Sequence, residues 1–268
     1  MPRDARDRGG APKLEPTVSL VEVFAAPQGE GRNAGRWAIF VRFAGCPLAC
    51  EFAPGVVCDT PYMKARHKVT LDALFDDMIA PLIPKVRTFG RARLEDAPML
   101  ILTGGEPTAS PQFDAVVLRA MQHTPTFYVA VETNGTTYRE TLETVDWITV
   151  SPKDQIAQTS TALAHNHNPQ SSKLSREVIT LLSKRAMTHG RGGEYRYVIA
   201  DENTGHPIYY AAPKHYVSPA VLSDGSGEEW RKGFPGFAPG AVDRCLEITR
   251  NDPRWRISVQ IHKVIGVR

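Results

Sequence analysis

Short apolar runs, rich in β-branched residues, recur along the chain, and each one leads into a polar loop, usually with glycine or proline. Runs of this length and composition are typical of strands buried in a sheet. They predict strands at 17–24, 38–43, 98–103, 127–132, 147–150, 195–200, 215–219 and 254–268.

Segments with helical periodicity lie between several of these strands. Thr70 and Ser175 are good N-caps, and Ser110 followed by Pro111 is a further helix start. These signals predict helices at 70–83, 110–123, 175–189 and 240–251. Strands that alternate with helices indicate an α/β fold with a largely parallel sheet, either a β/α barrel or an open part of one. In such folds the chemistry gathers on the loops that follow the strands.

The chain shows no internal repeat and no convincing domain boundary after residue 17. Residues 1–17 are charged and rich in proline and glycine, which predicts a disordered tail, and residues 18–268 are expected to form one domain. Polar, low-hydrophobicity stretches at 154–174 and 223–240 are predicted to be surface insertions.

Composition narrows the class of protein. The 268 residues are 42% apolar, enough for a sizeable core, and the net charge is only +3. That charge indicates neither a membrane role nor a nucleic-acid role. No apolar run approaches the ~18 residues of a membrane span, and no signal peptide is evident, so we expect a cytoplasmic protein. Stable disulfides are then not expected, and clustered cysteines favour metal or redox chemistry.

Three of the four cysteines, Cys46, Cys50 and Cys58, lie in the loop after the strand at 38–43. Their spacing matches no common zinc motif, so on spacing alone metal binding stands at even odds with the other interpretations. Three thiolates on one loop can hold three irons of a 4Fe–4S cubane and leave the fourth iron open. The fourth cysteine, Cys245, is predicted to be a core thiol, because Val242 and Ile248 share its helix face at a spacing of three.

Several loop motifs accompany the cysteines in a fixed order, and as a set they carry a family resemblance. They are QGEG (28–31), FVRFAGC (40–46), CDT (58–60), LTGGEP (102–107), ETNGT (132–136), VSPK (150–153) and SVQIHKVIGVR (258–268). In this set the chain resembles the 7-carboxy-7-deazaguanine synthases, a family of radical S-adenosylmethionine (SAM) enzymes. The usual cysteine motif of radical-SAM enzymes is C-x3-C-x2-C; here the second interval is five residues longer, and this family is known to tolerate enlarged cluster loops.

The resemblance implies a partial β/α barrel that converts 6-carboxy-5,6,7,8-tetrahydropterin to 7-carboxy-7-deazaguanine with loss of ammonia. It implies a 4Fe–4S cluster, SAM and Mg²⁺ as cofactors, and a place in deazapurine biosynthesis, usually towards queuosine. It also implies a homodimer and a flavodoxin- or ferredoxin-type electron donor, with no membrane and no direct nucleic-acid binding.

The resemblance assigns roles residue by residue. The cluster ligands would be Cys46, Cys50 and Cys58, and Thr60 would bind magnesium. SAM would contact Gly105, Ser151, Lys153 and Ser218. The pterin would contact Gln28, Gly29, Glu30, Arg42, Thr103, His262 and Arg268.

Side-chain chemistry agrees with some of these roles. Arg42 lies between apolar Val41 and Phe43, so it faces the other side of its strand, where a guanidinium can grip a carboxylate with two hydrogen bonds. Gln28 and Glu30 can pair with the donor and acceptor edge of an aminopyrimidinone.

The end of the chain provides a further expectation. Trp255, Ile257, Val259 and Ile261 alternate with Arg256, Ser258, Gln260 and His262, which predicts a strand whose polar face looks into the barrel. The resemblance implies that the carboxylate of Arg268 reaches the site. Two positions depart from the family: Ser218 stands where glutamine is frequent, and Arg268 where some relatives have proline.

Some interpretations stay open. Asp59 could join Thr60 on magnesium or be structural, Glu132 could be a base or cap its loop, and His165 with His167 is expected to be a solvated loop. Two other functions compete: a radical-SAM activating enzyme that forms a glycyl radical on a partner, and a cluster- or zinc-binding protein without catalysis.

Overall fold

The computed structural model describes residues 15–85, 96–154, 172–188, 191–224, 226 and 228–267. Most of the predicted tail, most of the 154–174 insertion, His165, His167 and Arg268 therefore lie outside the described residues.

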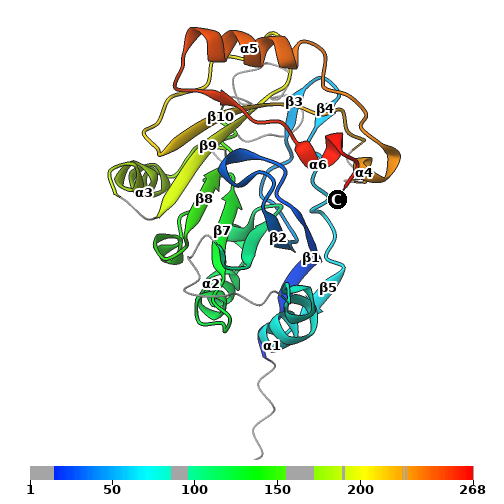
Figure 1. Ribbon diagram of the computed structural model, residues 1–268, viewed down its shortest axis with the longest axis vertical. Coiled ribbons are helices and arrows are strands. Elements are labelled where there is room, and N and C mark those ends of the chain that lie inside the picture. The colour runs from blue at the N-terminus through cyan, green and yellow to red at the C-terminus, as the bar shows by residue number, and fades with distance from the viewer. Residues whose placement is uncertain are drawn as a thin grey trace, which may run out of the picture.

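A curved sheet of nine strands forms the centre of the molecule, in the order β11-β10-β9-β8-β7-β6-β2-β1-β5 (Figure 1). The seven neighbouring strands β11, β10, β9, β8, β7, β6 and β2 run parallel to one another. Strand β1 is antiparallel to both of its neighbours, β2 and β5. Among the described residues the two outermost strands do not pair, so the sheet is an open, partial barrel. The strands are β1 Val18–Pro27, β2 Trp37–Phe43, β5 His67–Val69, β6 Met99–Gly104, β7 Tyr128–Thr133, β8 Trp147–Val150, β9 Gly192–Ile199, β10 Lys214–Pro219 and β11 Arg256–Ile257.

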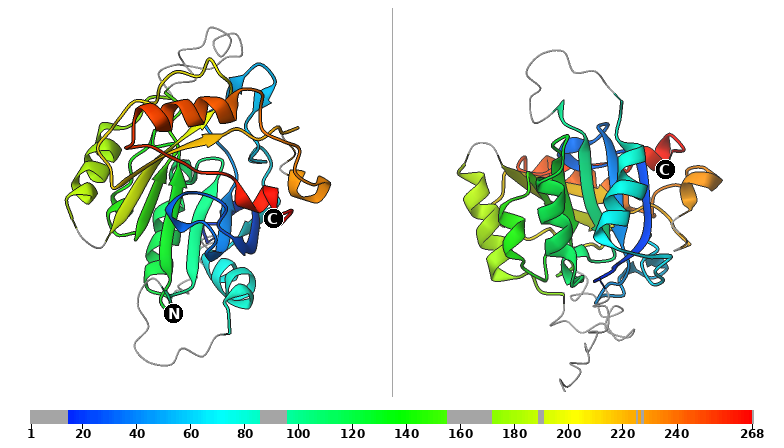
Figure 2. Two further views of the ribbon diagram at one scale, coloured as in Figure 1. Left: turned by 45° about the horizontal axis from the view of Figure 1, so that its top comes forward. Right: turned by 90° about the horizontal axis from the view of Figure 1, so that it is seen from below.

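Helices cover the outer face of this sheet, as the two views of Figure 2 show. The main ones are α2 (Phe113–Met121), α3 (Arg176–Ala186) and α5 (Ala241–Asn251). Their buried side chains join the outward-facing residues of the strands in one core, which includes Val41, Leu102, Val131, Ile148 and Tyr197. The remaining helices are α1 (Leu71–Ala73), continued by a π-helix over Leu74–Ile79, then α4 (Glu229–Lys232) and α6 (Ile261–Val264).

Two of the three predicted helix starts are confirmed. The Thr70 hydroxyl accepts a hydrogen bond from Ala73 N at 3.2 Å, and Ser175 caps α3 in the same way. The start at Ser110 is wrong: Pro107–Ala109 forms a 3₁₀ turn first, and α2 begins only at Phe113. The turn forms because the side chain of Glu106 caps it.

The predicted strand at 254–268 is also wrong beyond its start. Only Arg256–Ile257 pairs with β10, and the chain then leaves the sheet and turns into α6. The alternation of burial fails as well, because Ile257 and Ile261 are exposed. A hydrogen bond from Ile261 N to Gly29 O and an ion pair of Lys263 pull this segment across the open side of the sheet.

Two smaller predictions need correction. Cys245 is fully buried with Ile248, as expected, but Val242 is 37% exposed and is not part of that core. The 223–240 segment is not entirely superficial, since Ala238 is only 2% exposed.

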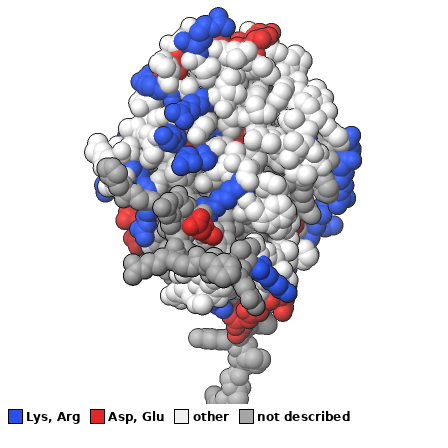
Figure 3. All heavy atoms as spheres, in the orientation of Figure 1, with Lys and Arg blue, Asp and Glu red and all other residues white. Residues whose placement is uncertain are grey.

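The molecular surface carries charges of both signs. Figure 3 shows lysine and arginine side chains in separate groups over one face of the molecule, with acidic side chains at a few places. Within the described part of the chain, no helix has both the length and the apolar character that a bilayer crossing requires.

Candidate active site

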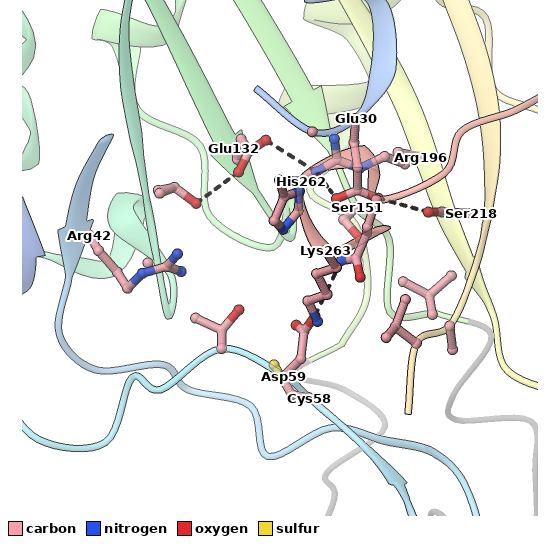
Figure 4. A pocket seen from close by; sticks show the side chains of 18 of the residues that line it. Glu30, Arg42, Cys58, Asp59, Glu132, Ser151, Arg196, Ser218, His262 and Lys263 are labelled. Carbon is pink, nitrogen blue, oxygen red and sulfur yellow. Dashed lines mark hydrogen bonds and ion pairs between the residues drawn. The ribbon is translucent and has the colours of Figure 1, made fainter. Parts of the chain in front are cut away.

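A cavity of about 260 Å³ opens on the inner face of the sheet, where the parallel strands end (Figure 4). The inward-facing side chains are polar there, in contrast to the apolar outer face. The sequence-predicted residues that line the cavity are Gln28, Gly29, Glu30, Arg42, Cys58, Thr60, Thr103, Gly105, Ser151, Lys153, Ser218 and His262.

The loop after β1 forms one wall, and the C-terminal segment rests on it. A Cβ at Gly29 would overlap the ring of His262, so glycine is required for this close approach. Gly31 N donates to Ser258 Oγ at 2.8 Å, and Arg32 N donates to Glu194 Oε2 at 2.9 Å. The C-terminal segment and β9 therefore fix the conformation of the loop that presents Gln28 and Glu30.

Glu132, at the end of β7, organises the floor of the cavity. It accepts hydrogen bonds from Gln28 Nε2 at 3.0 Å and Thr103 Oγ1 at 2.9 Å, and it pairs with Arg196 at 3.2 Å. Burial opposes its ionisation, but Arg196 and the two donors outweigh burial, so the pKa of Glu132 lies below its usual value. Glu132 does not cap its own loop. It is an ionised carboxylate that holds two predicted substrate contacts in place.

Glu106, from the GGEP motif, caps the loop after β7 in place of Glu132. Its carboxylate accepts from Thr133 Oγ1 and Asn134 N, both at 2.6 Å, and from Thr108 Oγ1 at 2.7 Å. It is 1% exposed, and burial raises its pKa. The residue therefore joins the loops after β6 and β7.

Arg196 is a cavity residue that the sequence interpretation missed. It is 8% exposed and lies near three carboxylates, at 3.2 Å from Glu132, 3.7 Å from Glu30 and 3.9 Å from Glu194. A usable signal existed, because Arg196 stands between Tyr195 and Tyr197, the same pattern that placed Arg42 inward. Burial opposes its charge, but the carboxylates prevail and raise its pKa.

Arg42 reaches the cavity from β2, as its position between apolar neighbours predicted. Its Nε donates to Glu22 Oε1 at 3.0 Å, and Figure 4 shows the guanidinium pointing into the cavity. Glu22 thus sets the direction of the cation.

Asp59 joins the cysteine loop to the C-terminal segment. Its Oδ2 accepts from Lys263 Nζ at 2.6 Å and from Gln260 Nε2 at 3.2 Å. Burial works against its charge, but Lys263 and Gln260 prevail and lower the pKa of Asp59 to about 2. Asp59 has a structural partner, which favours the structural interpretation. Lys263 is a further cavity residue that the sequence did not single out, whereas Gln260 belongs to the polar set that was expected to face the barrel.

Ser218 turns towards the loop after β1. Its hydroxyl lies 2.7 Å from Glu30 Oε1 and 2.7 Å from the carbonyl oxygen of Ser258. Lys153 Nζ donates to Ser151 Oγ at 2.6 Å, and it also lies 5.3 Å above the ring of Phe52.

The long interval between Cys50 and Cys58 folds into a β-hairpin, which the sequence did not predict. Its strands are β3 (Glu51–Ala53) and β4 (Val56–Val57), and the amide of Cys58 donates to the carbonyl of Cys50 at 3.0 Å. The extra residues project outwards as the hairpin, so the two cysteines remain neighbours at its base. Chain length is therefore compatible with a compact set of three thiols.

The thiols form one small cluster beside the cavity. Cys46, Cys50 and Cys58 pack with Leu48 and Phe52. Burial raises the pKa of Cys46 to about 11 and that of Cys50 to about 12, so the thiols are neutral until a metal displaces their protons. Within the described ranges no three Cys, His, Asp or Glu side chains converge on a single metal ion. A cubane differs from such a site because it spreads its thiolates over separate irons, and this donor set fits it.

Four buried polar atoms of residues that line the cavity have no hydrogen-bond partner among the described residues. They are Asn134 Nδ2, Arg196 Nη1, Gln260 Oε1 and His262 Nδ1. Buried polar groups are rarely left unpaired, so these atoms indicate a polar ligand. Burial also lowers the pKa of His262, which favours a neutral imidazole.

Comparisons with known proteins agree on one family name. No family model matches the chain. A 7-carboxy-7-deazaguanine synthase of Bacteroides thetaiotaomicron is 38% identical over 247 residues, which cover 92% of this chain and 97% of that protein. The 7-carboxy-7-deazaguanine synthase of Haemophilus influenzae is 26% identical over 95% of this chain and 96% of that protein. The one of Burkholderia multivorans is 28% identical over 94% of this chain and 99% of that protein.

The fold has a solved counterpart as well. The crystal structure of QueE from Escherichia coli matches with a TM-score of 0.52 and 18% identity, and it covers 92% of this chain and 95% of that chain. This likeness supports the open α/β barrel.

Proposed function

The chain belongs to the 7-carboxy-7-deazaguanine synthase family, and from this premise we propose that it makes 7-carboxy-7-deazaguanine from 6-carboxy-5,6,7,8-tetrahydropterin with loss of ammonia. The observation that carries the proposal is the shared cavity: a polar, hydrogen-bonding wall and a cysteine hairpin border the same 260 Å³ of space. A radical enzyme needs this arrangement, because the radical source and the substrate must lie in contact.

The cysteine loop and the glycine-rich loop are proposed to hold the cofactors. Cys46, Cys50 and Cys58 ligate a 4Fe–4S cluster, which when bound supplies the electron that cleaves SAM and starts hydrogen abstraction. SAM lies along Gly105, Ser151 and Lys153. The backbone at Gly105 supports this role, because it is held against the cysteine loop: Glu106 N donates to Gly45 O at 2.9 Å.

The polar wall is proposed to bind the pterin. Gln28, Gly29 and Glu30 pair with the aminopyrimidinone edge, and Arg42 binds the carboxylate. Thr103, which shares Glu132 with Gln28, is a further contact, and neutral His262 closes the site over Gly29. The Glu132–Arg196 pair supports these contacts, because it fixes the side chains of Gln28, Glu30 and Thr103 before the substrate arrives.

Thr60 is proposed to bind magnesium. The cavity offers its hydroxyl as one hard oxygen donor, while the neighbouring Asp59 is engaged by Lys263. Magnesium retains waters and takes ligands from its substrate, so one protein ligand is sufficient. The substrate carboxylate held by Arg42 is a second candidate donor.

The remaining assignments are proposals from the family. Residues 18–268 form the catalytic domain, two copies form a homodimer, and a flavodoxin- or ferredoxin-type protein delivers electrons in the cytoplasm. The carboxylate of Arg268 contacts the pterin. The product enters deazapurine biosynthesis.

The test is anaerobic turnover of the iron- and sulfide-loaded protein with dithionite, magnesium, SAM and 6-carboxytetrahydropterin. Mass spectrometry should detect 7-carboxy-7-deazaguanine and 5′-deoxyadenosine in wild type and in Cys245→Ala, and neither compound in Cys50→Ala. Deoxyadenosine without product would overturn the substrate and favour an activating enzyme. Neither compound, with an intact cluster, would favour the non-catalytic alternative.

A further inference from the structure

Two parts of the chain stand out in the sequence: the long interval of seven residues between Cys50 and Cys58, and the predicted insertion at 223–240. They are more than 160 residues apart in the sequence. In the fold they meet at the end of β10, where both contribute side chains to one apolar cluster.

Both segments are closed at their base by backbone hydrogen bonds of the β type. The hairpin is closed by the bond from Cys58 N to Cys50 O, at 3.0 Å. The insertion is closed by bonds from Ala238 N to Ala220 O, at 2.8 Å, and from Leu222 N to Gly236 O, at 3.0 Å.

The bases of the two segments share one apolar cluster. The hairpin contributes Ala53 and Val56, and the other members are alanines from the ends of β9 and β10, from the insertion and from the start of α5. The small side chains allow the hairpin to lie close to the backbone of these elements. The full set of buried members is Ala53, Val56, Ala200, Ala220, Ala238 and Ala241.

Phe52 connects this apolar cluster to the thiols. Its side chain packs against the cluster that contains Ala238, and also against the cluster that contains Cys50, Cys46 and Cys58. A displacement of the hairpin would therefore move the base at which Cys50 and Cys58 sit.

We propose that the hairpin 51–57 and the paired stretches 220–222 and 236–238 act together as a clasp that positions Cys50 and Cys58 for the iron–sulfur cluster. Ala238 is the positioning residue at the centre of the clasp. The proposal rests on the proposed function, because it takes the three cysteines as cluster ligands. It gives the two segments one shared role, in which the segment around Ala238 holds the long cysteine loop.

The test uses the full-length protein, with and without its cluster, and the variant Ala238→Asp. A buried carboxylate at this position should separate the two segments. Hydrogen–deuterium exchange of peptides covering 50–58 should accelerate about tenfold, and a chelator should remove iron about tenfold faster. The matched control, Val242→Asp, adds the same charge at a 37% exposed position four residues away and should match wild type in both measurements.

The clasp would be overturned if, in Ala238→Asp, the peptides covering 236–240 exchange faster than in wild type while those covering 50–58 exchange at the wild-type rate. If exchange in Ala238→Asp also accelerates in α3 and β7, the protein has unfolded more widely. The smaller change Ala238→Val is then used, and exchange of the 50–58 and 236–240 peptides is compared in the same way. The electron paramagnetic resonance signal of the reduced cluster provides a second criterion, since a merely structural defect elsewhere would leave it unchanged. If the wild-type protein, with its hairpin intact, forms no product, that result counts against the proposed function and not against the clasp.

Discussion

At the scale of single residues, side chains that approach the cavity divide into those that face a ligand and those that hold others in place. Ser218 belongs to the second group in this structure, because its hydroxyl is 2.7 Å from Glu30 Oε1. The family resemblance instead assigns position 218 to SAM. The two assignments differ in which substrate should suffer when the hydroxyl is removed.

We predict that Ser218→Ala raises KM for the pterin and not for SAM. One hydrogen bond to a carboxylate contributes roughly 1.5 kcal/mol, so KM should rise about tenfold. Ser218→Thr keeps the hydroxyl and should restore KM. Steady-state kinetics with each substrate varied in turn would check this, and a rise in KM for SAM alone would support the family assignment.

Glu106 gives a prediction about stability. Its two oxygens accept four hydrogen bonds, so an amide at this position would place a donor against Asn134 N or against the threonine hydroxyls. Glu106→Gln should lower the free energy of unfolding by about 1–3 kcal/mol in urea denaturation. Glu140→Gln, at an exposed position, is the control and should change it by less than about 0.5 kcal/mol. Equal values for both variants would contradict the role of Glu106.

Residue patterns could predict which side chains face inward, but not what they bind to. Arg42 was placed correctly because period-two alternation settles the face of a strand. The same alternation also places Arg196 on the inner face of its strand. Its partner carboxylates, Glu30 and Glu132, come from distant parts of the chain and could not be predicted. For the same reason, one of the two alternatives for Glu132, the loop cap, is wrong: a carboxylate near its own loop is a plausible cap in sequence, and only the fold brings Gln28 and Thr103 to it.

At the scale of elements, the C-terminal segment depends on tertiary contacts that override its local pattern. Its alternation predicts a strand, but Lys263 and Gln260 bind Asp59, and the chain forms the short helix α6 instead. The hairpin between Cys50 and Cys58 was missed for a related reason. Its apolar residues are too few to form a recognisable strand pattern, and the cluster that buries them comes from the far end of the chain.

The ion pair between Asp59 and Lys263 leads to a prediction about α6. Asp59 side-chain atoms are 31% exposed and those of Lys263 only 8%, so the pair is partly screened. Lys263→Met and Asp59→Asn should each lower the free energy of unfolding by about 1–3 kcal/mol, and the double variant by less than the sum. Denaturation of the four proteins would measure this coupling.

The same variants should loosen α6 and raise KM for the pterin, because His262 lies in that helix. Lys232→Met provides a contrast, since Lys232 pairs with Asp224 at the surface, where both side chains are more than half exposed. It should change stability by less than about 0.5 kcal/mol. Additive effects of Lys263→Met and Asp59→Asn would show that the pair does not act as a unit.

At the scale of the whole molecule, the distribution of polarity across the sheet explains both fold and site. The outer face is apolar and is covered by α2, α3 and α5, whereas the inner face becomes polar where the strands end. This much was predictable, because strand periodicity and loop composition are local. A partial barrel was expected from the family resemblance, but α6 and the hairpin were not predictable, since both are held by contacts between distant parts of the chain.

Because α6 closes over buried charges, the stability of the whole chain should depend on the protonation of His262. Burial lowers the pKa of His262 below 6.5, although Glu30, Asp59 and Glu132 oppose this shift and Lys263 adds to it. Between that lowered pKa and 6.5 the unfolded chain binds a proton that the folded chain does not. The contribution of His262 is therefore complete above pH 6.5 and is lost as pH falls through this window, by at most about 1.4 kcal/mol per pH unit. Urea unfolding at pH 7.5 and 5.5 measures this loss in the free energy of unfolding. For His262→Gln the difference between the same two pH values should be smaller. An equal loss in both proteins would show that other groups carry the dependence on pH.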